Sequence, residues 1–500
     1  MQQFFRSYKK MKKVYLRLHT ILHIIIFCVF LLAACSQSAQ EKNRLTFNEN
    51  GRFKIVQFTD LHLRHGEPAV ARTLETIRLI LAAEKPDFAV ITGDIVWYMP
   101  NREPWIELAN VFEEAKIPFT VTFGNHDGSA NTKITRSEII DLLSQSPYFA
   151  GEKGPKEIRG IGNFVLPVYG SNNKMAALLY CFDSNTYSSD PRLPGFEPVH
   201  FNQIEWYRQQ SKKYTAMNGG SPLPALAFFH IPLQEYALVA ERLFPNAPRR
   251  QMTVQSHNTG LFGSFLEMED VMGVFVGHLH GNDFIGIEKY IALAYGLVTG
   301  WGAASSKERG ARIIEIYENE FVFDSWLRTA RGAGQYFNFP TGITSIDEDT
   351  MTYLAAKNVH PTKQGVAYKY FEGRFGSVRN IDPNKMVSEG VMKNFSITEA
   401  PAEDCFAYEF RTFIKIPERG VYNFYTISDD DSQIYINDVL VVNKPGSAIA
   451  RVENKVALEA GFHEMKVLFY EDFWGQFLEV GYSSKNIRSQ KIPDEAVYLN

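Results

Sequence analysis

Five short apolar runs in this chain end in aspartate, asparagine or histidine, and this recurrence constrains the fold more than any other feature. The fullest example is the run Phe119–Thr122, which leads into Phe123-Gly124-Asn125-His126-Asp127. Apolar runs of this length are typical of buried strands, and functional side chains of open α/β sheets gather where the strands end. The other four are Phe58-Thr59-Asp60-Leu61-His62, Thr92-Gly93-Asp94, Phe228-Phe229-His230 and Phe275-Val276-Gly277-His278-Leu279-His280.

Strand-like and helix-like segments alternate between about residues 52 and 328. Apolar residues recur at helical spacing from Pro68 to Glu84, and Lys85-Pro86-Asp87 is a sequence that ends a helix. A second helix is predicted over residues 105–115. The predicted strands are Phe53–Phe58, Phe88–Ile91, Phe119–Phe123, Ala177–Phe182, Ala225–Phe229, Gly273–Val276 and Ala311–Ile316. Successive β-α units of this kind predict a three- or four-layer α/β domain.

The texture of the sequence changes after residue 330. Residues 331–361 show no clear periodicity and are predicted to form a connector. From residue 362 to residue 500 the chain contains short alternating strand-like runs without helical periodicity, which is typical of a β-sandwich. Two domains, residues 51–330 and 362–500, also suit a chain of 500 residues, which exceeds what one hydrophobic core usually serves.

The N-terminus has the composition of an export signal. Six basic residues precede an apolar stretch at residues 21–34, a pattern of secretory signals and not of spanning helices. The small residues that lead into Cys35 resemble a bacterial lipoprotein cleavage box. This resemblance implies a signal peptide at residues 1–34, a lipid on Cys35, a tether over residues 35–50 and a bacterial cell-envelope location, on the periplasmic face or the cell surface. A plain export signal and an uncut anchor are the alternatives.

Charge and cysteine content exclude two classes of protein. Removal of the predicted signal takes six basic and no acidic residues from a chain of net charge −4, which leaves about −10. Such a surface does not attract nucleic-acid backbones, so no nucleic-acid partner is expected. Cys181 and Cys405 lie in different predicted domains, so a fold held together by a framework of disulfides is not expected.

The donors at the ends of the five runs form a metal-binding set. Carboxylate, imidazole and amide oxygen suit zinc, manganese or iron. No cysteine is among the seven donors, which argues against a structural zinc site, because such sites use cysteine ligands. Seven donors exceed the needs of one four-coordinate ion, whereas two ions that share a carboxylate would use them all. Two such ions can clamp a phosphoryl group and activate a water, so the set predicts a hydrolase. The seven residues are Asp60, His62, Asp94, Asn125, His230, His278 and His280.

In this order, the five motifs resemble the blocks of the calcineurin-like metallophosphoesterases, and the resemblance covers most of residues 52–328. It implies an α-β-β-α metallophosphoesterase sandwich and a metal-activated hydroxide as the nucleophile. It also implies that His126 gives a proton to the leaving oxygen and that Asp127 orients His126 by a hydrogen bond. By the same resemblance, one ion is held by Asp60, His62 and His280, the other by Asn125, His230 and His278, and Asp94 bridges the two.

Within that superfamily, residues 277–284 and 299–312 are similar to the purple-acid-phosphatase-like branch. The chain departs from the true purple enzymes at Trp97, which stands where they have an iron-binding tyrosine. This departure argues against an iron–tyrosinate site, and it leaves iron, manganese and zinc open as the two ions. Asn282, Trp301 and Arg309 are candidates for the substrate mouth, with structural roles as the alternative.

The segment from Gly420 to Asn437 resembles the β-sandwich named after anthrax protective antigen, and the resemblance extends over residues 362–497. Such modules often bind carbohydrate. Asp429 and Asp430 either ligate calcium or sugar there, or accept hydrogen bonds that cap a turn, and the turn is the favoured reading.

Together these features predict an exported, lipid-anchored hydrolase of phosphomonoesters or phosphodiesters. Its substrate would be a phosphorylated small molecule or glycan, and its C-terminal module would bind carbohydrate. One alternative is a catalytically inert carbohydrate-binding surface lipoprotein, and another is a structural or adhesion lipoprotein. Seven intact ligand positions disfavour the first alternative, and the presence of both His126 and Asp127 disfavours the second.

Overall fold

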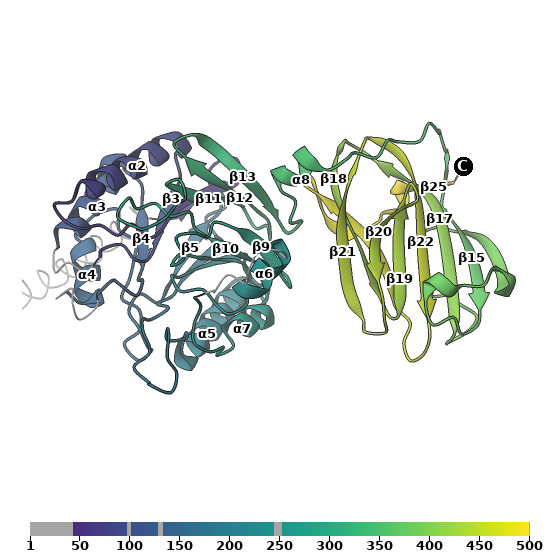
Figure 1. The fold of residues 1–500 in the computed structure, drawn as a ribbon, viewed down its shortest axis with the longest axis horizontal. Coiled ribbons are helices and arrows are strands. Elements are labelled where there is room, and N and C mark those ends of the chain that lie inside the picture. The colour runs from purple at the N-terminus through teal and green to yellow at the C-terminus, as the bar shows by residue number, and fades with distance from the viewer. Residues whose placement is uncertain (1–43, 98–101, 129–133, 245–252, 500) are drawn as a thin grey trace, which may run out of the picture.

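The computed structural model describes residues 44–97, 102–128, 134–244 and 253–499. Two bodies lie side by side in Figure 1, an α/β body that contains the N-terminal half and an all-β body that contains the C-terminal third. The predicted signal peptide, Cys35 and most of the tether lie outside the described residues, so the lipoprotein hypothesis stays a prediction. Among the described residues, no helix is long and apolar enough to cross a membrane.

The first sheet of the α/β body has six strands. Strands β2, β3 and β4 are parallel neighbours, and β11, β12 and β13 continue the sheet in antiparallel fashion. All five residues of β3 are buried, which explains why the sequence of this central strand is apolar throughout. In spatial order the strands are β13 (Gly332–Phe339), β12 (Phe323–Thr329), β11 (Gly310–Tyr317), β2 (Arg52–Phe58), β3 (Phe88–Thr92) and β4 (Phe119–Thr122).

The second sheet has seven strands and packs face to face against the first. Strands β6, β7, β8 and β10 are parallel neighbours, whereas β5 and β9 pair antiparallel with β6 and β10. The order is β1 (Leu45–Thr46), β5 (Phe164–Tyr169), β6 (Met175–Cys181), β7 (Ala225–Phe228), β8 (Val271–Val276), β10 (Ile291–Tyr295) and β9 (Ile285–Glu288).

Helices cover the outer faces of both sheets, so that four layers enclose three cores. One core joins the six-stranded sheet to α2 (Pro68–Glu84), α3 (Glu103–Ala115) and α4 (Arg136–Leu143). Another joins the seven-stranded sheet to α5 (Phe201–Met217), α6 (Tyr236–Leu243) and α7 (Leu261–Met268). The third lies between the sheets and contains Ile55, Val90 and Phe228. The predicted α-β-β-α architecture is confirmed.

Helix α2 shows how the local sequence sets an element. Pro68 occupies its first turn, where a missing backbone N–H costs nothing. The helix ends at Glu84 because Lys85 takes a left-handed conformation, with φ of 47°, and Pro86 cannot continue the ladder. The predicted stop at Lys85-Pro86-Asp87 is therefore correct, and it delivers the chain directly into β3.

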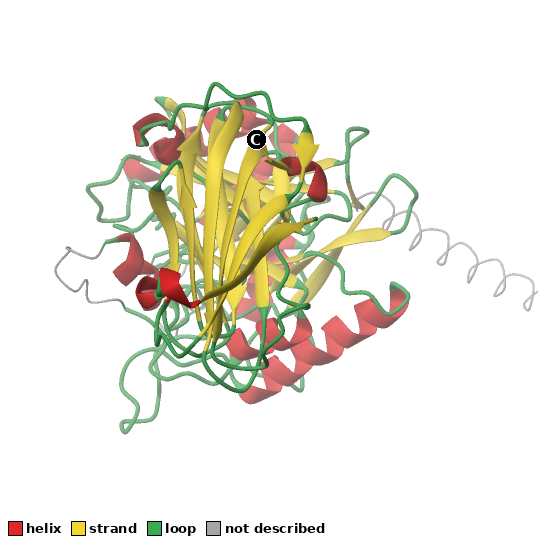
Figure 2. Ribbon diagram, turned by 90° about the vertical axis from the view of Figure 1, so that its right-hand side faces the viewer, coloured by secondary structure: helices red, strands yellow, loops and turns green. Residues whose placement is uncertain are grey.

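The C-terminal body is built from two antiparallel sheets that pack through one apolar core. Figure 2 views the molecule from this side and shows mainly strands. The smaller sheet runs β21 (Ala450–Leu458), β18 (Gly420–Ser428), β23 (Leu478–Ser484) and β24 (Ile487–Lys491). The larger sheet contains β14 (Lys363–Gln364), β25 (Val497–Leu499), β17 (Phe406–Ile416), β22 (Gly461–Glu471), β19 (Asp431–Ile436) and β20 (Val439–Lys444), with β15 (Val366–Glu372) beside β17 and β16 (Met386–Met392) beside β15.

The predicted connector, residues 331–361, is more ordered than its sequence indicates. Its first part is strand β13, the edge strand of the six-stranded sheet, and its middle contains α8 (Ser345–Thr350). Glycines within β13 and its exposed edge position hide the alternation that marks most strands. The rest packs on the sandwich: Lys455 Nζ lies 2.5 Å from an oxygen of Asp347 and donates to the carbonyl of Gly342 at 2.7 Å.

Candidate metal centre

The ends of five strands bring the seven predicted ligands to one edge of the α/β body. Strands β2, β3 and β4 are parallel in one sheet, and β7 and β8 are parallel in the other, so their carboxyl ends point to the same side of each sheet. In each loop the first ligand lies within three residues of the last residue of the strand. The loops after β2, β3, β4, β7 and β8 carry, in that order, Asp60 and His62, Asp94, Asn125, His230, and His278 and His280.

Four of the seven residues have backbone conformations that L-amino acids rarely adopt. Their φ angles lie between 47° and 77°, in the left-handed region, which stores about 1–3 kcal/mol of strain per residue and is found mostly at functional sites. The four are Asp60, His62, Asp94 and His278. Neighbouring glycines permit the crowding: a Cβ on Gly124 would lie 2.2 Å from Asp94 Oδ1, and one on Gly93 would lie 2.5 Å from His230 Nδ1.

The first group of donors comprises Asp60, His62 and His280. One ligand atom from each lies within 4.8 Å of the others, and His280 Nε2 is 3.4 Å from Asp60 Oδ1. The other ring nitrogen of His280, Nδ1, lies 3.0 Å from the carbonyl oxygen of Ala304, which turns Nε2 toward the group. The hydroxyl of Thr59 donates to Asp60 Oδ2 at 2.9 Å and holds that carboxylate in place.

The second group comprises Asp94, His230 and His278, again within 4.8 Å of one another. Asp94 Oδ2 is 3.2 Å from His230 Nε2 and 3.8 Å from His62 Nε2, so this carboxylate lies between the two groups, as a bridge must. The carbonyl of Thr92 fixes the His230 ring through Nδ1 at 2.8 Å. Asn125 orients its amide by donating from Nδ2 to the hydroxyl of Tyr187 at 3.3 Å.

The residues fit a pair of metal ions on an independent criterion, the state of their donor atoms. Buried polar atoms normally have hydrogen-bond partners, and an orphaned one calls for an explanation. Several buried donor atoms in the two groups have no hydrogen-bond partner among the described residues. These atoms are His62 Nε2, Asn125 Oδ1, His230 Nε2, and Nδ1 and Nε2 of His278. Two cations would satisfy the amide oxygen and one nitrogen of each ring.

The electrostatics of the centre favour the ligand forms of His62, His278 and Asp94, whereas the adjacent Asp94 carboxylate outweighs burial and raises the pKa of His230 to about 9. Burial lowers the pKa of His62 to about 4 and that of His278 to about 3, so both rings are neutral near pH 7. Burial alone would raise the pKa of Asp94, but the histidines around it, His230 foremost, hold that pKa well below its usual range. Ionised carboxylates and neutral imidazoles are the forms that bind metal.

His126 lies over the centre without joining either group. Its Nε2 is 3.7 Å from Asp94 Oδ2, and its backbone N–H donates to Asp94 Oδ1 at 3.0 Å. The prediction that the Asp127 carboxylate accepts a hydrogen bond from this ring is wrong. Asp127 instead accepts three backbone N–H groups at 2.9–3.0 Å, from Ile95, Val96 and Gly124. Asp127 therefore ties the β3 and β4 loops together, because its carboxylate lies beside both chain segments.

Trp97 packs against the imidazoles from the side of β3. Its ring stacks on His62 with centroids 4.4 Å apart and lies 4.0 Å from the centroid of His126. An indole has no oxygen to offer a metal, so at this position the chain has a wall of the site and not a ligand. Contact with Trp97 limits the rotation of the His126 ring, and Nε2 of that ring faces Asp94.

The three candidate substrate residues differ in their surroundings. Arg309 donates to the carbonyl oxygens of Gly300, Ala303, Ser305 and Lys307, which gives its guanidinium an architectural role. Trp301 donates from Nε1 to Thr76 Oγ1 at 3.0 Å and lies under the guanidinium of Arg72, on the surface of α2. Asn282 is buried behind the His280 loop.

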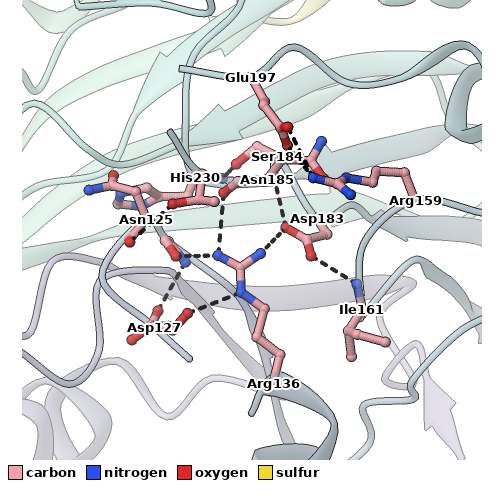
Figure 3. Close-up of polar contacts among 12 residues, drawn as sticks. Asn125, Asp127, Arg136, Arg159, Ile161, Asp183, Ser184, Asn185, Glu197 and His230 are labelled. Carbon is pink, nitrogen blue, oxygen red and sulfur yellow. Dashed lines mark hydrogen bonds and ion pairs between the residues drawn. The ribbon is translucent and has the colours of Figure 1, made fainter. Parts of the chain in front are cut away.

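Sequence reasoning missed a group of residues that position the second set of ligands. Figure 3 shows Arg136, Asp183 and Ser184 beside Asn125 and His230, joined by hydrogen bonds and an ion pair. Asp183 and Ser184 lie two and three residues beyond β6, and Arg136 begins α4. An apolar run that ends at Asp183 was a local signal for the first two, whereas only the fold brings Arg136 to the site.

The aspartates of the C-terminal β18–β19 turn are engaged by the backbone. Asp429 Oδ1 accepts the N–H of Asp430 at 3.1 Å, and Asp430 Oδ2 accepts the N–H of Asp472 at 2.5 Å. The favoured interpretation of these residues as turn-forming therefore has observed contacts. The described part of this body contains no group of three or more His, Cys, Asp or Glu ligand atoms close enough to hold an ion.

Comparison with known proteins decides the family. Residues 53–282 match the model of the calcineurin-like phosphoesterase family, and residues 362–496 match the PA14 domain. A relative named "Probable inactive purple acid phosphatase 29", from Arabidopsis thaliana, is 30% identical over 350 residues, which are 62% of this chain and 90% of the relative. The chain belongs to the calcineurin-like phosphoesterase family. It carries a C-terminal PA14 domain in addition.

Two further relatives of this phosphoesterase have similar alignments. "Probable inactive purple acid phosphatase 14" from Arabidopsis thaliana is 27% identical over 59% of this chain and 83% of the relative. "Phosphatase DCR2" from Saccharomyces cerevisiae is 28% identical over 59% of this chain and 57% of its own. The homologues are thus purple-acid-phosphatase-like, as predicted. Because some are named inactive and another a phosphatase, family membership establishes the fold and leaves turnover to be argued from the site.

Among solved structures, a dimetal phosphatase from Danio rerio covers 57% of this chain and 98% of its own, with a TM-score of 0.39 and 10% identity. An epithelial adhesin 9 A domain from Candida glabrata, solved in complex with Galβ1-3GlcNAc, covers 29% of this chain and 95% of its own, with a TM-score of 0.24 and 12% identity. At TM-scores below 0.5, neither likeness carries a functional argument.

Proposed function

We propose that this protein is a metal-dependent hydrolase of phosphomonoesters or phosphodiesters. The observation that carries the proposal is the position of Asp94 between two groups of ligands, several of whose buried donor atoms lack hydrogen-bond partners among the described residues. When bound there, two divalent or trivalent ions, iron, manganese or zinc, would activate a water and neutralise charge that develops on phosphoryl oxygens. Asp60, His62 and His280 would hold one ion, Asn125, His230 and His278 the other, and Asp94 both.

The chain's own side chains have defined tasks in such a reaction. His126 stands beside Asp94, where its ring can donate a proton to the leaving oxygen of the ester. Burial lowers the pKa of this ring below its ordinary value, so a smaller fraction of the ring is protonated at neutral pH. Proton donation by His126 would therefore be most effective at acidic pH. Asp127 keeps the His126 loop against β3 through its three backbone hydrogen bonds.

A phosphate-release assay tests this proposal. Purified protein, stripped of metal and then supplied with Mn²⁺, Zn²⁺ or Fe²⁺, should hydrolyse aryl phosphomonoesters or phosphodiesters, and metal analysis should find two ions per chain. A panel that includes sugar phosphates and nucleotides would identify the class of phosphorylated small molecule or glycan. Two bound ions without turnover of any ester would instead favour the alternative, a catalytically inert surface protein that binds carbohydrate.

For the C-terminal domain we propose carbohydrate binding at the loop between β22 and β23. PA14 membership supports it, and so does the loop itself: Trp474 is 97% exposed and is flanked by the exposed rings of Phe473 and Phe477. The backbone beneath is fixed, since the N–H of Trp474 donates to Asp404 and the carbonyl of Phe477 accepts from Asp429. Exposed aromatic rings beside carboxylates provide apolar and hydrogen-bonding contacts together, as a sugar face requires.

Titration of the full chain with oligosaccharides tests this second proposal. We expect Trp474→Ala to weaken binding about tenfold or more, because an aromatic anchor of this kind is worth about 2 kcal/mol. Tyr290→Ala is the matched control, since Tyr290 is also strongly exposed but lies on the phosphoesterase domain between β9 and β10. Equal binding by the wild type and Trp474→Ala would refute the assignment of the loop.

We further propose that the mature chain is exported and anchored by lipid on Cys35, on the strength of the basic head, apolar stretch and small residues at the N-terminus. The bacterial cell envelope would be its location. In cells, Cys35→Ala should move the protein from the membrane fraction to the soluble fraction. A Cys35→Ala protein that stays with the membrane would contradict the lipid anchor.

A further inference from the structure

Asp183, Ser184 and Asn185 follow strand β6. Directly or through Arg136, they contact the loop that carries Asn125 and the loop that carries His230. We propose that this segment and Arg136 form a brace that fixes the distance between the Asn125 loop and the His230 loop, and thereby sets the affinity of the second metal position. The inference rests on the proposed metal-dependent function. Arg136, Asp183 and Ser184 are positioning residues, since none contributes an atom to the centre.

Arg136 holds the Asn125 loop at both of its ends. Its Nη2 donates to the carbonyl oxygen of Gly124 at 2.7 Å, and its Nε donates to that of Asp127 at 3.0 Å, so Asn125 and His126 lie between two clamped peptide groups. The same guanidinium places Nη1 2.5 Å from Asp183 Oδ1. Its planar fork allows these bonds to form simultaneously, which a lysine could not reproduce.

Asp183 is itself fixed from two further directions. It is fully buried, and its Oδ2 accepts the N–H of Ile161 at 2.8 Å while its Oδ1 accepts the N–H of Asn185 at 2.8 Å. Arg136 also donates to the carbonyl of Asn185 at 3.3 Å. The carboxylate is therefore an immobile anchor, and the position of Arg136 follows from it.

Ser184 holds the other loop. Its Oγ accepts the N–H of His230 at 3.3 Å and the N–H of Ile231 at 2.9 Å, and the side chain is fully buried. Two adjacent residues of one segment thus contact the two loops separately, Asp183 through Arg136 and Ser184 directly. Figure 3 shows Asn125 and His230 next to each other with this segment beside them.

The need for a brace follows from where the two ligands come from. Asn125 follows β4, at the edge of the six-stranded sheet, whereas His230 follows β7, in the seven-stranded sheet. Among the described residues no strand pairing joins the two sheets, and a metal site tolerates ligand displacements of only about 0.2 Å. Arg136 begins α4, which covers the first sheet, and Asp183 follows β6 of the second, so their ion pair connects the two layers beside the site.

Metal titration of the metal-free full-length protein tests the brace. In Ser184→Ala and Arg136→Lys we expect one of the two Mn²⁺ dissociation constants to rise about 10–100-fold, the usual effect of losing a partner that orients a ligand, with the other constant unchanged. Ester hydrolysis by both variants should recover in excess Mn²⁺. Arg159→Gln is the matched control, because it removes a nearby pair, Arg159–Glu197 at 2.9 Å, that touches neither loop.

Two results would overturn the brace while leaving the proposed function intact: unchanged dissociation constants in both variants, or equal weakening of both ions with no recovery in excess metal, which a merely structural role would produce. If Arg136→Lys does not fold, Ser184→Ala still decides, since it removes a single oxygen. A wild-type protein that binds no Mn²⁺, Zn²⁺ or Fe²⁺ would overturn the brace and the proposed function together.

Discussion

Two sets of buried carboxylates lie in this chain, one around Asp94 in the phosphoesterase domain and one around Asp430 in the PA14 domain. In the first, imidazoles lie 3.2–3.8 Å from Asp94 Oδ2, and neighbouring donor atoms have no hydrogen-bond partner among the described residues. In the second, Asp429 and Asp430 accept backbone N–H groups, and Lys444 Nζ donates to the carbonyl of Asp430 at 2.6 Å. Unpartnered buried atoms also occur in the second set, at Asp431 Oδ1 and at both carboxylate oxygens of Glu471, so the imidazoles gathered around Asp94 are what mark the first set as a metal centre among the described residues.

The two sets also differ in the direction in which their neighbours shift a carboxyl pKa. Burial tends to raise a carboxyl pKa in both. Around Asp94 the histidines reverse this effect and hold the carboxylate ionised. At Glu471 the neighbours are Asp430 and Asp429, so burial and like charges act together and raise its pKa to about 8. Substitutions in the first set should therefore change chemistry, and substitutions in the second should change stability.

The largest effect is expected from Asp94→Ala. Loss of the carboxylate between the two groups should remove at least one ion and reduce phosphate release by more than the 10–100-fold that loss of an outer partner causes. Metal analysis and the phosphate-release assay measure both. Asp141→Ala, at an exposed acid that pairs with Lys153, should retain two ions and full activity. Full occupancy of both positions without Asp94 would show that it is not the bridge.

A smaller loss is expected from His126→Ala. Removal of a proton donor that is not a ligand should lower the turnover rate about 10²–10⁴-fold and leave two ions bound. Turnover of esters with very good leaving groups should fall less, because they need less protonation. His65→Ala is the control, an exposed histidine that lies 3.2 Å from Glu107. Equal loss with every leaving group would argue against the role of proton donor.

The smallest effect is expected from Glu471→Gln, and it concerns stability. The folded-state pKa of Glu471, about 8, exceeds its ordinary value of 4.5. Its stabilising contribution is therefore complete below about pH 4.5 and is lost as the pH rises through about 8. Glu471→Gln should raise the unfolding midpoint of the C-terminal domain more at pH 8 than at pH 5, as measured by thermal unfolding at both pH values.

Phosphate release by Glu471→Gln should equal that of the wild type if the comparison between the two sets holds. Glu389→Gln, at an exposed position of β16, provides the reference for loss of one charge. Parallel pH dependence of unfolding in Glu471→Gln and the wild type would show that this carboxyl titrates normally.

How far the sequence could predict the fold depended on burial. The run of β3 and the helix Pro68–Glu84 were recognisable because one is buried on all sides and the other on a regular face. Strand β13 was missed because an edge strand with glycines needs no alternation, and α4 was missed because eight residues give little periodicity. Asp127 was assigned the wrong contact, since the sequence places it beside His126 but the turn directs its carboxylate back to β3.

The sequence by itself determined which chemical groups are present and at which strand ends they lie, because strand ends and donor types are local properties. Only the tertiary structure decided that these groups converge around Asp94, that Trp97 walls the site, and that Arg136 and Ser184 join two sheets behind it. Such relations depend on residues far apart in the chain, and they arise when sheets pack and bury polar groups that must then find partners.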